Sequence, residues 1–359
     1  MKTIVVSAVN IRKGGTLTIL KQCLAHLSSL VQSQDEACPQ EERLHVTALV
    51  HRRQLCDYPG IEYIEMPWCI RSWGLRLWAE YVTMHRISKD IARRQGGRKV
   101  WLWLSMHDTT PRVEAQHREV YCHTSFPFLK LQWRDWVMNP KIPLFCLLGR
   151  LVYRINAGRN DSIIVQQNWF ADAMSGLLGV PRGKFRVIPP VTDVQAPSPQ
   201  AGAQPSFRQD VPVFFFASTA DCHKNFETLC MAAAGLEAEG KKFRVVLTVK
   251  GDENRYAKWL FKHWGQVKSI DFHGFMSKDE LYGTYRNADC FVFPSRIETW
   301  GLPISEYMHH NPSGRLLLAD LPYARETSSG RGDFFPATDV AALKEMMEDI
   351  INRYYEKRY

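Results

Sequence analysis

The stretch CFVFPSRIETWGLPISE, residues 290–306, joins a short apolar run to a loop and a helix start that carry two carboxylates. Cys290–Phe293 is typical of a buried parallel strand, and the Pro-Ser pair after it ends the strand. A proline suits the first turn of a helix, which we expect at Pro303–His310. Glu298 then lies in the loop and Glu306 in the first turn of that helix. Because ligands bind at the carboxyl ends of parallel strands, both acids are candidates for one site.

Two interpretations of this loop follow from its chemistry. A carboxylate can accept two hydrogen bonds from a vicinal diol, so the acids could hold sugar hydroxyls. Gly301 lets the backbone approach a ligand closely, and the free N–H groups of the helix start suit a phosphate. The alternative is structural: Glu306 complements the helix dipole and Glu298 is a surface residue. The glycine and proline between the acids favour the binding site.

Apolar runs alternate with helical patterns through most of the chain, which predicts parallel sheets covered by helices on both faces. We therefore expect an α/β fold of two doubly wound domains, 1–190 and 213–337. A Pro-rich linker, 191–212, joins them, and a C-terminal helix, 338–359, is expected to pack back toward the first domain. Strands are expected at Thr3–Val9, Leu44–His51, Lys99–Ser105, Glu119–His123, Ser162–Gln166, Val213–Ser218, Phe243–Lys250, Val267–Phe272, Asp289–Phe293 and Arg315–Ala319, and helices at Thr16–Leu30, Gly74–Arg93, Asn225–Glu239 and Arg255–Trp264.

The composition is that of an ordinary soluble globular protein, and its positive charge fits either an anionic partner or solubility alone. A chain of 359 residues is too long for a single core. Its N-terminal apolar run predicts a first strand and not a signal peptide, and no apolar run is long enough to span a bilayer. Nine cysteines without a Cys-x-x-Cys pair favour reduced thiols in a cytosolic compartment. The net charge of +9 is consistent with nucleic acid, an anionic membrane or phosphate-bearing ligands.

A second loop predicts a phosphate site. Lys224 lies just before an expected helix start at Asn225, which is a good N-cap residue. An ammonium group in this position can neutralise a diphosphate leaving group without a metal. The alternative is a solvated loop lysine. No Asp-x-Asp occurs in the chain, and its acid and histidine clusters lack a convincing ligand spacing, so we expect neither a metal nor a cofactor.

Residues 291–306 resemble the E-x7-E signature of retaining GT-B glycosyltransferases, most closely glycosyltransferase family 4 (glycosyl transferases group 1). Phe272–Leu281 resembles the family's loop before the helix that borders the nucleotide base. Leu318–Glu326 resembles the segment after its next strand. The resemblance implies a GT-B fold, in which two Rossmann-like domains face a central cleft. The N-terminal domain would take the acceptor and the C-terminal domain the nucleotide-sugar.

The resemblance also implies residue roles in the second domain. Glu306 would bind the ribose hydroxyls and Glu298 the transferred sugar. Backbone amides at Gly301 and Leu302 would contact sugar or phosphate, and Phe275 would lie near the base.

The phosphate side departs from the family pattern at one position. Lys224 matches a Lys-Asn segment that binds phosphate, but the family's arginine six residues earlier is replaced by Ser218. Stabilisation of the leaving group would then depend on Lys224 or on another cation, for which Arg296 is an unsupported candidate.

In the first domain the resemblance concerns one loop and one strand end. Gly14 and Gly15 follow the first strand and would face the donor phosphates, although a plain strand-to-helix turn explains them equally well. His123 would contact the transferred sugar or the reacting end of the acceptor. His107 is a second candidate for the acceptor side. A lone histidine at a strand end is more often a structural hydrogen-bonding residue.

The segment Phe126–Arg159 is dense in aromatic and basic residues. Such a segment can lie on an anionic membrane surface, or it can be a helix packed on the sheet whose basic side chains reach solvent. Many members of the family work at the cytosolic face of a membrane, which favours peripheral attachment.

The function we expect is a retaining, metal-independent glycosyltransferase. Its donor would be a UDP-, GDP- or dTDP-sugar, and its acceptor a hydroxyl of a glycan or lipid-linked glycan in cell-surface polysaccharide or glycolipid synthesis. The alternatives are a nucleotide-sugar epimerase of GT-B fold and a non-catalytic GT-B partner protein. A nucleic-acid-binding protein is not expected, because no RNA-binding motif accompanies the basic charge.

Overall fold

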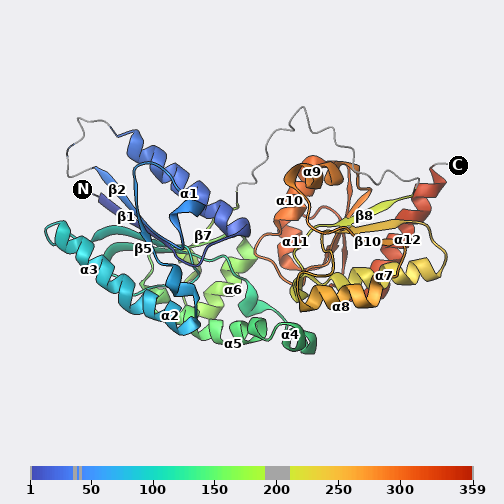
Figure 1. The fold of residues 1–359 in the computed structure, drawn as a ribbon, viewed down its shortest axis with the longest axis horizontal. Helices are drawn as coiled ribbons and strands as arrows, with labels where there is room; N and C mark the ends of the chain where they lie inside the picture. The colour runs from blue at the N-terminus through green and yellow to red at the C-terminus, as the bar shows by residue number, and fades with distance from the viewer. Residues whose placement is uncertain (1, 35–38, 40–42, 191–210, 358–359) are drawn as a thin grey trace. The chain divides into compact units, whose positions relative to one another are not determined.

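The computed structural model describes residues 2–34, 39, 43–190 and 211–357, which fold into two parallel α/β units (Figure 1). One unit comprises Met1–Thr124 and Leu148–Pro190, and the other Ser125–Leu147 and Val191–Tyr359. The two units also divide at Pro190, where a boundary was predicted, but the segment Ser125–Leu147, from the middle of the first predicted domain, belongs to the second unit. Nearly all of the expected linker, 191–212, lies outside the described residues.

The first unit is built on a seven-stranded parallel sheet with the order β3-β2-β1-β4-β5-β6-β7. The register of the central pair runs from Lys2 opposite Leu44 to Ala8 opposite Val50. The five strands predicted in this half of the chain are all present, each within a few residues of its expected bounds. The strands are β1 (Lys2–Ala8), β2 (Leu44–Val50), β3 (Ile61–Glu65), β4 (Val100–Ser105), β5 (Ala115–Tyr121), β6 (Ser162–Val165) and β7 (Phe185–Val187).

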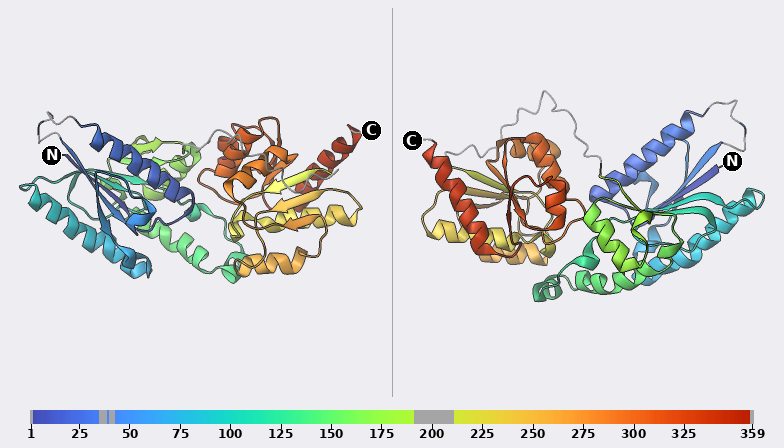
Figure 2. Two further views of the ribbon diagram at one scale, coloured as in Figure 1. Left: turned by 45° about the horizontal axis from the view of Figure 1, so that its top comes forward. Right: turned by 180° about the vertical axis from the view of Figure 1, so that it is seen from behind.

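Alternate residues of β1 contribute to two cores on opposite faces of this sheet. Ile4 packs in a cluster with Leu20 and Leu24, whereas Val5 packs with Ala79 and Met84. Helices therefore cover both faces, as the continuous apolar strands predict (Figure 2). The helices are α1 (Gly14–Gln32), α2 (Trp73–Trp78), a π-helical turn at Ala79–Thr83, α3 (Met84–Arg94), α5 (Lys141–Arg154, which begins in the other unit) and α6 (Asn168–Leu178).

The second unit contains a six-stranded parallel sheet with the order β10-β9-β8-β11-β12-β13. The order reverses between β8 and β11, which are paired directly, with Phe215 opposite Phe291. The loops that follow these two strands thus leave the same edge of the sheet side by side, which is the usual ligand position in such folds. The strands are β8 (Val213–Phe216), β9 (Arg244–Leu247), β10 (Ile270–Phe272), β11 (Cys290–Phe293), β12 (Arg315–Ala319) and β13 (Asp333–Phe335).

The C-terminal helix α12 (Val340–Glu356) packs against α7 (Phe226–Ala238) of the same unit. It belongs to the second unit, and the expectation that it packs back toward the first domain stays a prediction. Among the described residues, the structure has no helix with the length and apolar character needed to cross a bilayer. The remaining helices of this unit are α4 (Trp133–Met138), α8 (Arg255–Trp264), α9 (Lys278–Asn287), α10 (Leu302–His310) and α11 (Pro322–Thr327).

Candidate functional site

The loops after β8 and β11 are joined by an ion pair. Lys224 Nζ lies 2.5 Å from Glu298 Oε1, and the two side chains are only 16% and 15% exposed. The sequence predicted a role for each residue but not that they would contact each other. An ammonium group has three N–H donors, and a hydrogen bond to one carboxylate oxygen uses only one of them. The other N–H groups of Lys224 can donate to a second, anionic partner.

Asn225 holds this arrangement in place. Its backbone is left-handed, with φ of 60°, and its side-chain amide donates to the carbonyl oxygens of Pro294 (3.0 Å) and Ala337 (2.6 Å). Asn225 is the N-cap residue of α7, as predicted, but its side chain makes no cap hydrogen bond to the helix. Its Oδ1 instead accepts from the Thr228 hydroxyl at 2.8 Å. The residue therefore links the loop before α7 to the end of β11.

The start of α10 depends on Gly301. This residue has φ of 88°, a conformation that favours glycine, and a Cβ atom there would lie 3.2 Å from Ile304 Cδ1. The helix begins at Leu302, one residue earlier than expected, so Glu306 is its fifth residue. The prediction that Glu306 lies in the first turn is therefore wrong, and complementing the helix dipole is not its main role.

Glu306 is partly buried beside an aromatic residue. The Tyr285 hydroxyl donates to Glu306 Oε2 at 3.3 Å, and burial raises the pKa of this carboxyl group, with the Tyr285 hydrogen bond opposing the shift. Tyr285 is fully buried, so it fixes the position of the acid. An acid kept close to the protein interior in this way is suited to hydrogen bonds with hydroxyl groups of a ligand.

The two remaining donor-side candidates of the second unit follow β8 and β10, which are separated in the sheet by β9. The backbone N–H of Ser218 donates to Thr248 Oγ1 at 2.8 Å, and the Thr248 hydroxyl donates back to the Ser218 carbonyl oxygen. This fixes the end of β8 through its backbone. Phe275, after β10, is 93% exposed, which is exceptional for an aromatic side chain and leaves its ring open to stacking.

Arg296 does not replace the missing arginine. Its guanidinium forms a two-pronged ion pair with Asp135 and also donates to the carbonyl oxygens of Lys130 and Cys222. The Arg296 and Asp135 side chains are 6% and 1% exposed. Arg296 therefore has a structural role, which is to fasten α4 to the loop after β11.

In the first unit, His123 lies at the end of β5 as predicted. Its ring stacks on Tyr121 with a centroid separation of 4.3 Å, and both ring nitrogens are buried without a hydrogen-bond partner among the described residues. Burial lowers the pKa of His123 to about 3, so the imidazole is neutral at physiological pH. A neutral imidazole with no protein partner can donate to or accept from a ligand hydroxyl.

Asp108, which the sequence analysis did not single out, holds the backbone around His123. Its Oδ1 accepts from the backbone N–H groups of His123 (2.5 Å) and Thr124 (2.9 Å), and its Oδ2 accepts from the Thr124 hydroxyl. The residue is buried and has a left-handed backbone, with φ of 68°. Such strain in a residue other than glycine often marks a functional site.

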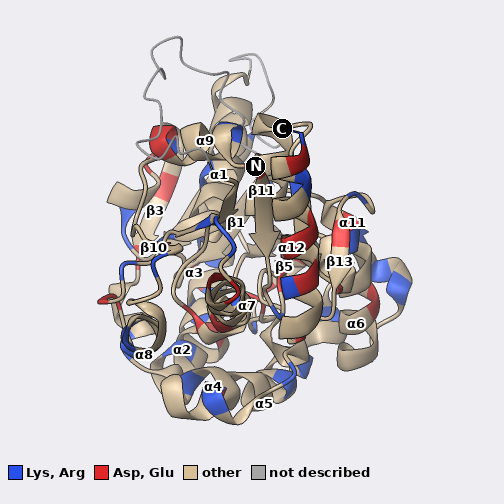
Figure 3. Cartoon of the chain, turned by 90° about the vertical axis from the view of Figure 1, so that its right-hand side faces the viewer, with Lys and Arg blue, Asp and Glu red and all other residues tan. Residues whose placement is uncertain are grey.

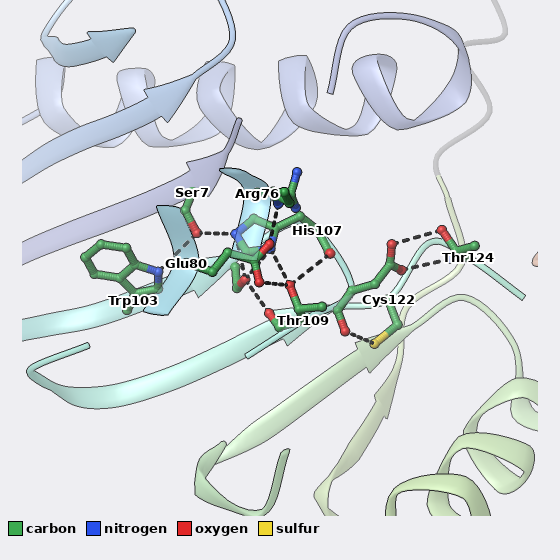
Figure 4. A network of polar contacts seen from close by, with 10 residues as sticks. Ser7, Arg76, Glu80, Trp103, His107, Thr109, Cys122 and Thr124 are labelled. Carbon is green, nitrogen blue, oxygen red and sulfur yellow. Dashed lines mark hydrogen bonds and ion pairs between the residues drawn. The ribbon is translucent and has the colours of Figure 1, made fainter. Parts of the chain in front are cut away.

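His107 is enclosed in a buried polar network (Figure 4). It is 3% exposed, and its ring nitrogens lie 2.9 Å from Ser7 Oγ and from Thr109 Oγ1. Thr109 donates in turn to Glu80 in the π-helical turn, and Glu80 pairs with Arg76. The expectation that His107 contacts an acceptor is therefore wrong, because its hydrogen-bonding atoms are used inside the protein.

Three buried histidines make stability depend on pH. Burial lowers the pKa of His107, His123 and His223, while in the unfolded chain these groups titrate near 6.5. Below that pH the unfolded state binds more protons than the folded state. The contribution of these histidines to the unfolding free energy is therefore fully present above about pH 7 and is lost as the pH falls toward the folded-state pKa values.

We expect His123→Phe, which keeps the stacking on Tyr121, to reduce the slope of unfolding free energy against pH by up to about 1.4 kcal/mol per unit between pH 6 and 4. Urea unfolding at several pH values measures this, and parallel slopes for the two proteins would contradict it.

The Gly14–Gly15 loop begins α1, a 19-residue helix. Gly14 has φ of 70°, and a Cβ atom at this position would meet no atom within 4 Å. Its conformation, rather than crowding, therefore accounts for this glycine.

Among the described residues no group of three or more histidines, cysteines or acids is placed to bind a metal ion.

Comparisons with known proteins agree with this arrangement. Residues 199–311 match the family described as Glycosyl transferases group 1, and no curated protein sequence matches the chain. Sucrose-phosphate synthase from Thermosynechococcus elongatus is similar in structure, with a TM-score of 0.66 and 15% identity over 99% of this chain and 91% of that one. HepE from Anabaena, in complex with UDP and glucose, has a TM-score of 0.62 and 13% identity over 97% and 90% of the two chains. WaaG, a glycosyltransferase involved in lipopolysaccharide biosynthesis, has a TM-score of 0.61 and 13% identity over 98% and 90%.

At these identities the neighbours establish the fold. The α/β prediction of two Rossmann-like parallel-sheet domains of the GT-B type is confirmed. The family match falls on the unit that carries Lys224, Glu298 and Glu306. Together, the match to Glycosyl transferases group 1 and the GT-B structural neighbours support a glycosyltransferase.

Proposed function

We propose that the chain transfers a sugar from a nucleotide diphosphate to a hydroxyl of a glycan or lipid-linked glycan, with retention of configuration and without a metal ion. The observation that carries this proposal is the Lys224–Glu298 pair, which lies where the strand order of the second sheet reverses and within the segment that matches the family. Parallel sheets bind ligands at this position. UDP-, GDP- and dTDP-sugars are the donors to test.

The proposed roles follow from the geometry of each residue. The ammonium group of Lys224 neutralises charge on the departing diphosphate, and Glu298, which shares its position, accepts hydrogen bonds from the sugar. The backbone N–H groups of Gly301 and Leu302, at the start of α10, face sugar or phosphate. Glu306 binds the ribose, and the ring of Phe275 stacks near the base. Ser218 contributes its backbone to the phosphate side.

In the first unit, His123 is proposed to act on the transferred sugar or the acceptor. Its imidazole is neutral and lacks a protein partner, so it can hydrogen-bond to a hydroxyl without introducing charge. Gly14 and Gly15 remain candidates for a donor phosphate, because they begin a long helix whose first N–H groups are free for an anion.

A test of the donor site is the substitution Glu306→Ala. We expect it to weaken binding of the preferred nucleotide-sugar by about 10- to 100-fold, because hydrogen bonds to a charged group contribute about 1.5–3 kcal/mol. Isothermal titration calorimetry against UDP-, GDP- and dTDP-sugars measures this loss. The control is Glu345→Ala, an exposed acid on α12, which we expect to leave binding unchanged. Unchanged affinity in the Glu306 variant would remove the ribose assignment.

A non-catalytic GT-B protein is the second candidate, and one observation favours it. The arginine expected six residues before Lys224 is Ser218, and Arg296 is committed to Asp135. A protein of this kind would bind the nucleotide-sugar but release no nucleotide diphosphate over a panel of acceptors. Donor turnover, measured with the protein that binds in the calorimetric screen, separates the two functions.

A glycosyltransferase with these substrates would work in the cytoplasm, at the inner face of the cytoplasmic membrane, where nucleotide-sugars meet lipid-linked acceptors. This location is part of the proposal. We expect no interaction with nucleic acid, and cell-surface polysaccharide or glycolipid synthesis is the process that fits.

A further inference from the structure

Exposed large apolar side chains are concentrated on and next to the helices α4 and α5. Among the described residues sixteen large apolar side chains are exposed, and eight of them lie between residues 133 and 155. Soluble proteins usually expose such side chains singly, and a contiguous group marks an interaction surface. We name this group the α4–α5 surface. It consists of Trp133, Trp136, Val137, Leu144, Leu147, Leu148, Leu151 and Ile155.

The exposed residues of α5 follow the helical repeat. Leu144, Leu147, Leu148 and Leu151 lie three, four and seven residues apart, and Ile155, just after the helix end, follows Leu151 by four, so they form one stripe. The opposite face of the helix is buried through Ile142, Cys146 and Tyr153. The helix is thus apolar on two faces, and folding of the chain covers only one of them.

The same surface is strongly basic. Residues 129–159 contain six lysines and arginines and a single acid, a net charge of +5 (six minus one), against +9 for the whole chain. The one acid, Asp135, is buried and paired with Arg296, so its charge is not presented to solvent, and among the six cations Arg134 is itself paired with Glu227. Figure 3 shows the basic residues in blue on α4 and α5. The six cations are Lys130, Arg134, Lys141, Arg150, Arg154 and Arg159.

Internal contacts hold α4 rigidly, so its tryptophans are not exposed merely because the segment is loose. Arg134 pairs with Glu227 at 2.5 Å, and its guanidinium lies 4.6 Å from the centre of the Trp259 ring. Phe126 packs edge-on against His223. Trp133, at 71% exposure, and Trp136 therefore project from an anchored helix.

We propose that the α4–α5 surface docks on a membrane that contains anionic lipids. Apolar and aromatic side chains with flanking cations are the combination that binds at the headgroup boundary, where rings enter the interface and cations meet lipid phosphates. A second copy of this chain fits less well, because a two-fold interface would place the same cations opposite one another. The inference is independent of the transfer reaction, since it involves neither Lys224 nor either glutamate of the donor site.

The test is flotation of the full chain with phosphatidylcholine vesicles and with vesicles of equal parts phosphatidylcholine and phosphatidylglycerol. We expect binding to the mixed vesicles only, and weaker binding at higher salt. Lys141→Gln with Arg150→Gln should lower the partition coefficient roughly 30-fold, and Leu144→Gln, Leu147→Gln and Leu151→Gln together by about 10-fold or more.

Matched controls place the same changes elsewhere in the chain. Arg86→Gln with Lys89→Gln on α3, and Leu30→Gln on α1, should bind vesicles as the unchanged protein does. The proposal would be overturned if the control variants lost as much vesicle binding as the surface variants. It would also be overturned if the unchanged protein did not bind the mixed vesicles. Sedimentation equilibrium measures the oligomeric state. If the leucine substitutions convert a dimer to a monomer, the surface binds a second copy of this chain and not a membrane. Nucleotide-sugar affinity should be unchanged in every variant, so failure here is distinct from failure of the donor site.

Discussion

Lys224→Met is expected to lower the turnover of sugar transfer by about 100- to 1000-fold with little change in KM. In the proposed reaction the ammonium group would stabilise negative charge that grows on the diphosphate as it leaves, so its contribution would be larger in the transition state than in the bound donor. Losses of this size are typical when one preorganised group at a developing charge is removed. Initial rates with the preferred donor and acceptor measure the effect.

The ion pair complicates this experiment, and a double variant resolves it. Lys224→Met removes the only described ion-pair partner of Glu298, whose side chain is mostly buried. The unpaired carboxylate could by itself distort the loop. If the loss were due only to that stranded carboxylate, Lys224→Met combined with Glu298→Gln would recover most of the activity. We expect the double variant to remain at least as slow as the single one. Lys224→Arg, which keeps the charge, should retain more activity than Lys224→Met.

Arg296→Met is expected to lower the free energy of unfolding of the second unit by about 3–5 kcal/mol. Its ion pair with Asp135 is almost fully buried, so removing the cation strands a carboxylate inside the protein. Urea unfolding measures the loss. Arg353→Met removes an exposed pair with Asp349 and should cost at most about 0.5 kcal/mol.

A double-mutant cycle distinguishes this explanation from a loss of packing. Arg296→Met with Asp135→Leu removes both charges, and the double variant should be more stable than Arg296→Met alone. Limited proteolysis adds a local measurement, because release of α4 should expose the segment 125–147 to cleavage. Equal losses in the single and double variants would show that the charge pair is not what holds α4.

The sequence predicted the strands near the donor site because their signal is local. Cys290–Phe293 and Val213–Phe216 are uninterrupted apolar runs that end at turn residues, and such runs form buried parallel strands whatever the rest of the chain does. The ends of these strands then give the position of Lys224 and Glu298 at the sheet edge. Three strands were missed: β3 alternates with glutamates at the edge of the sheet, and β7 and β13 have only three residues each.

What the sequence could not predict depends on contacts between distant residues. Arg296 and Asp135 are 161 positions apart, and neither position shows a periodic pattern that would pair them. The assignment of 125–147 to the second unit follows from that pair and from Arg134 with Glu227, so a boundary placed by composition misses it. His107 and Asn225 are similar cases: their residue types suggested an acceptor contact and a side chain that caps the helix, but buried hydrogen-bond partners determine their roles.

We propose that the second unit holds a nucleotide-sugar at the ends of β8 and β11. The decisive experiment is a crystal structure of the chain with the nucleoside diphosphate of its preferred donor. We expect a diphosphate oxygen within hydrogen-bond distance of Lys224 Nζ and the ribose hydroxyls against the Glu306 carboxylate. A nucleotide bound away from both side chains would contradict it.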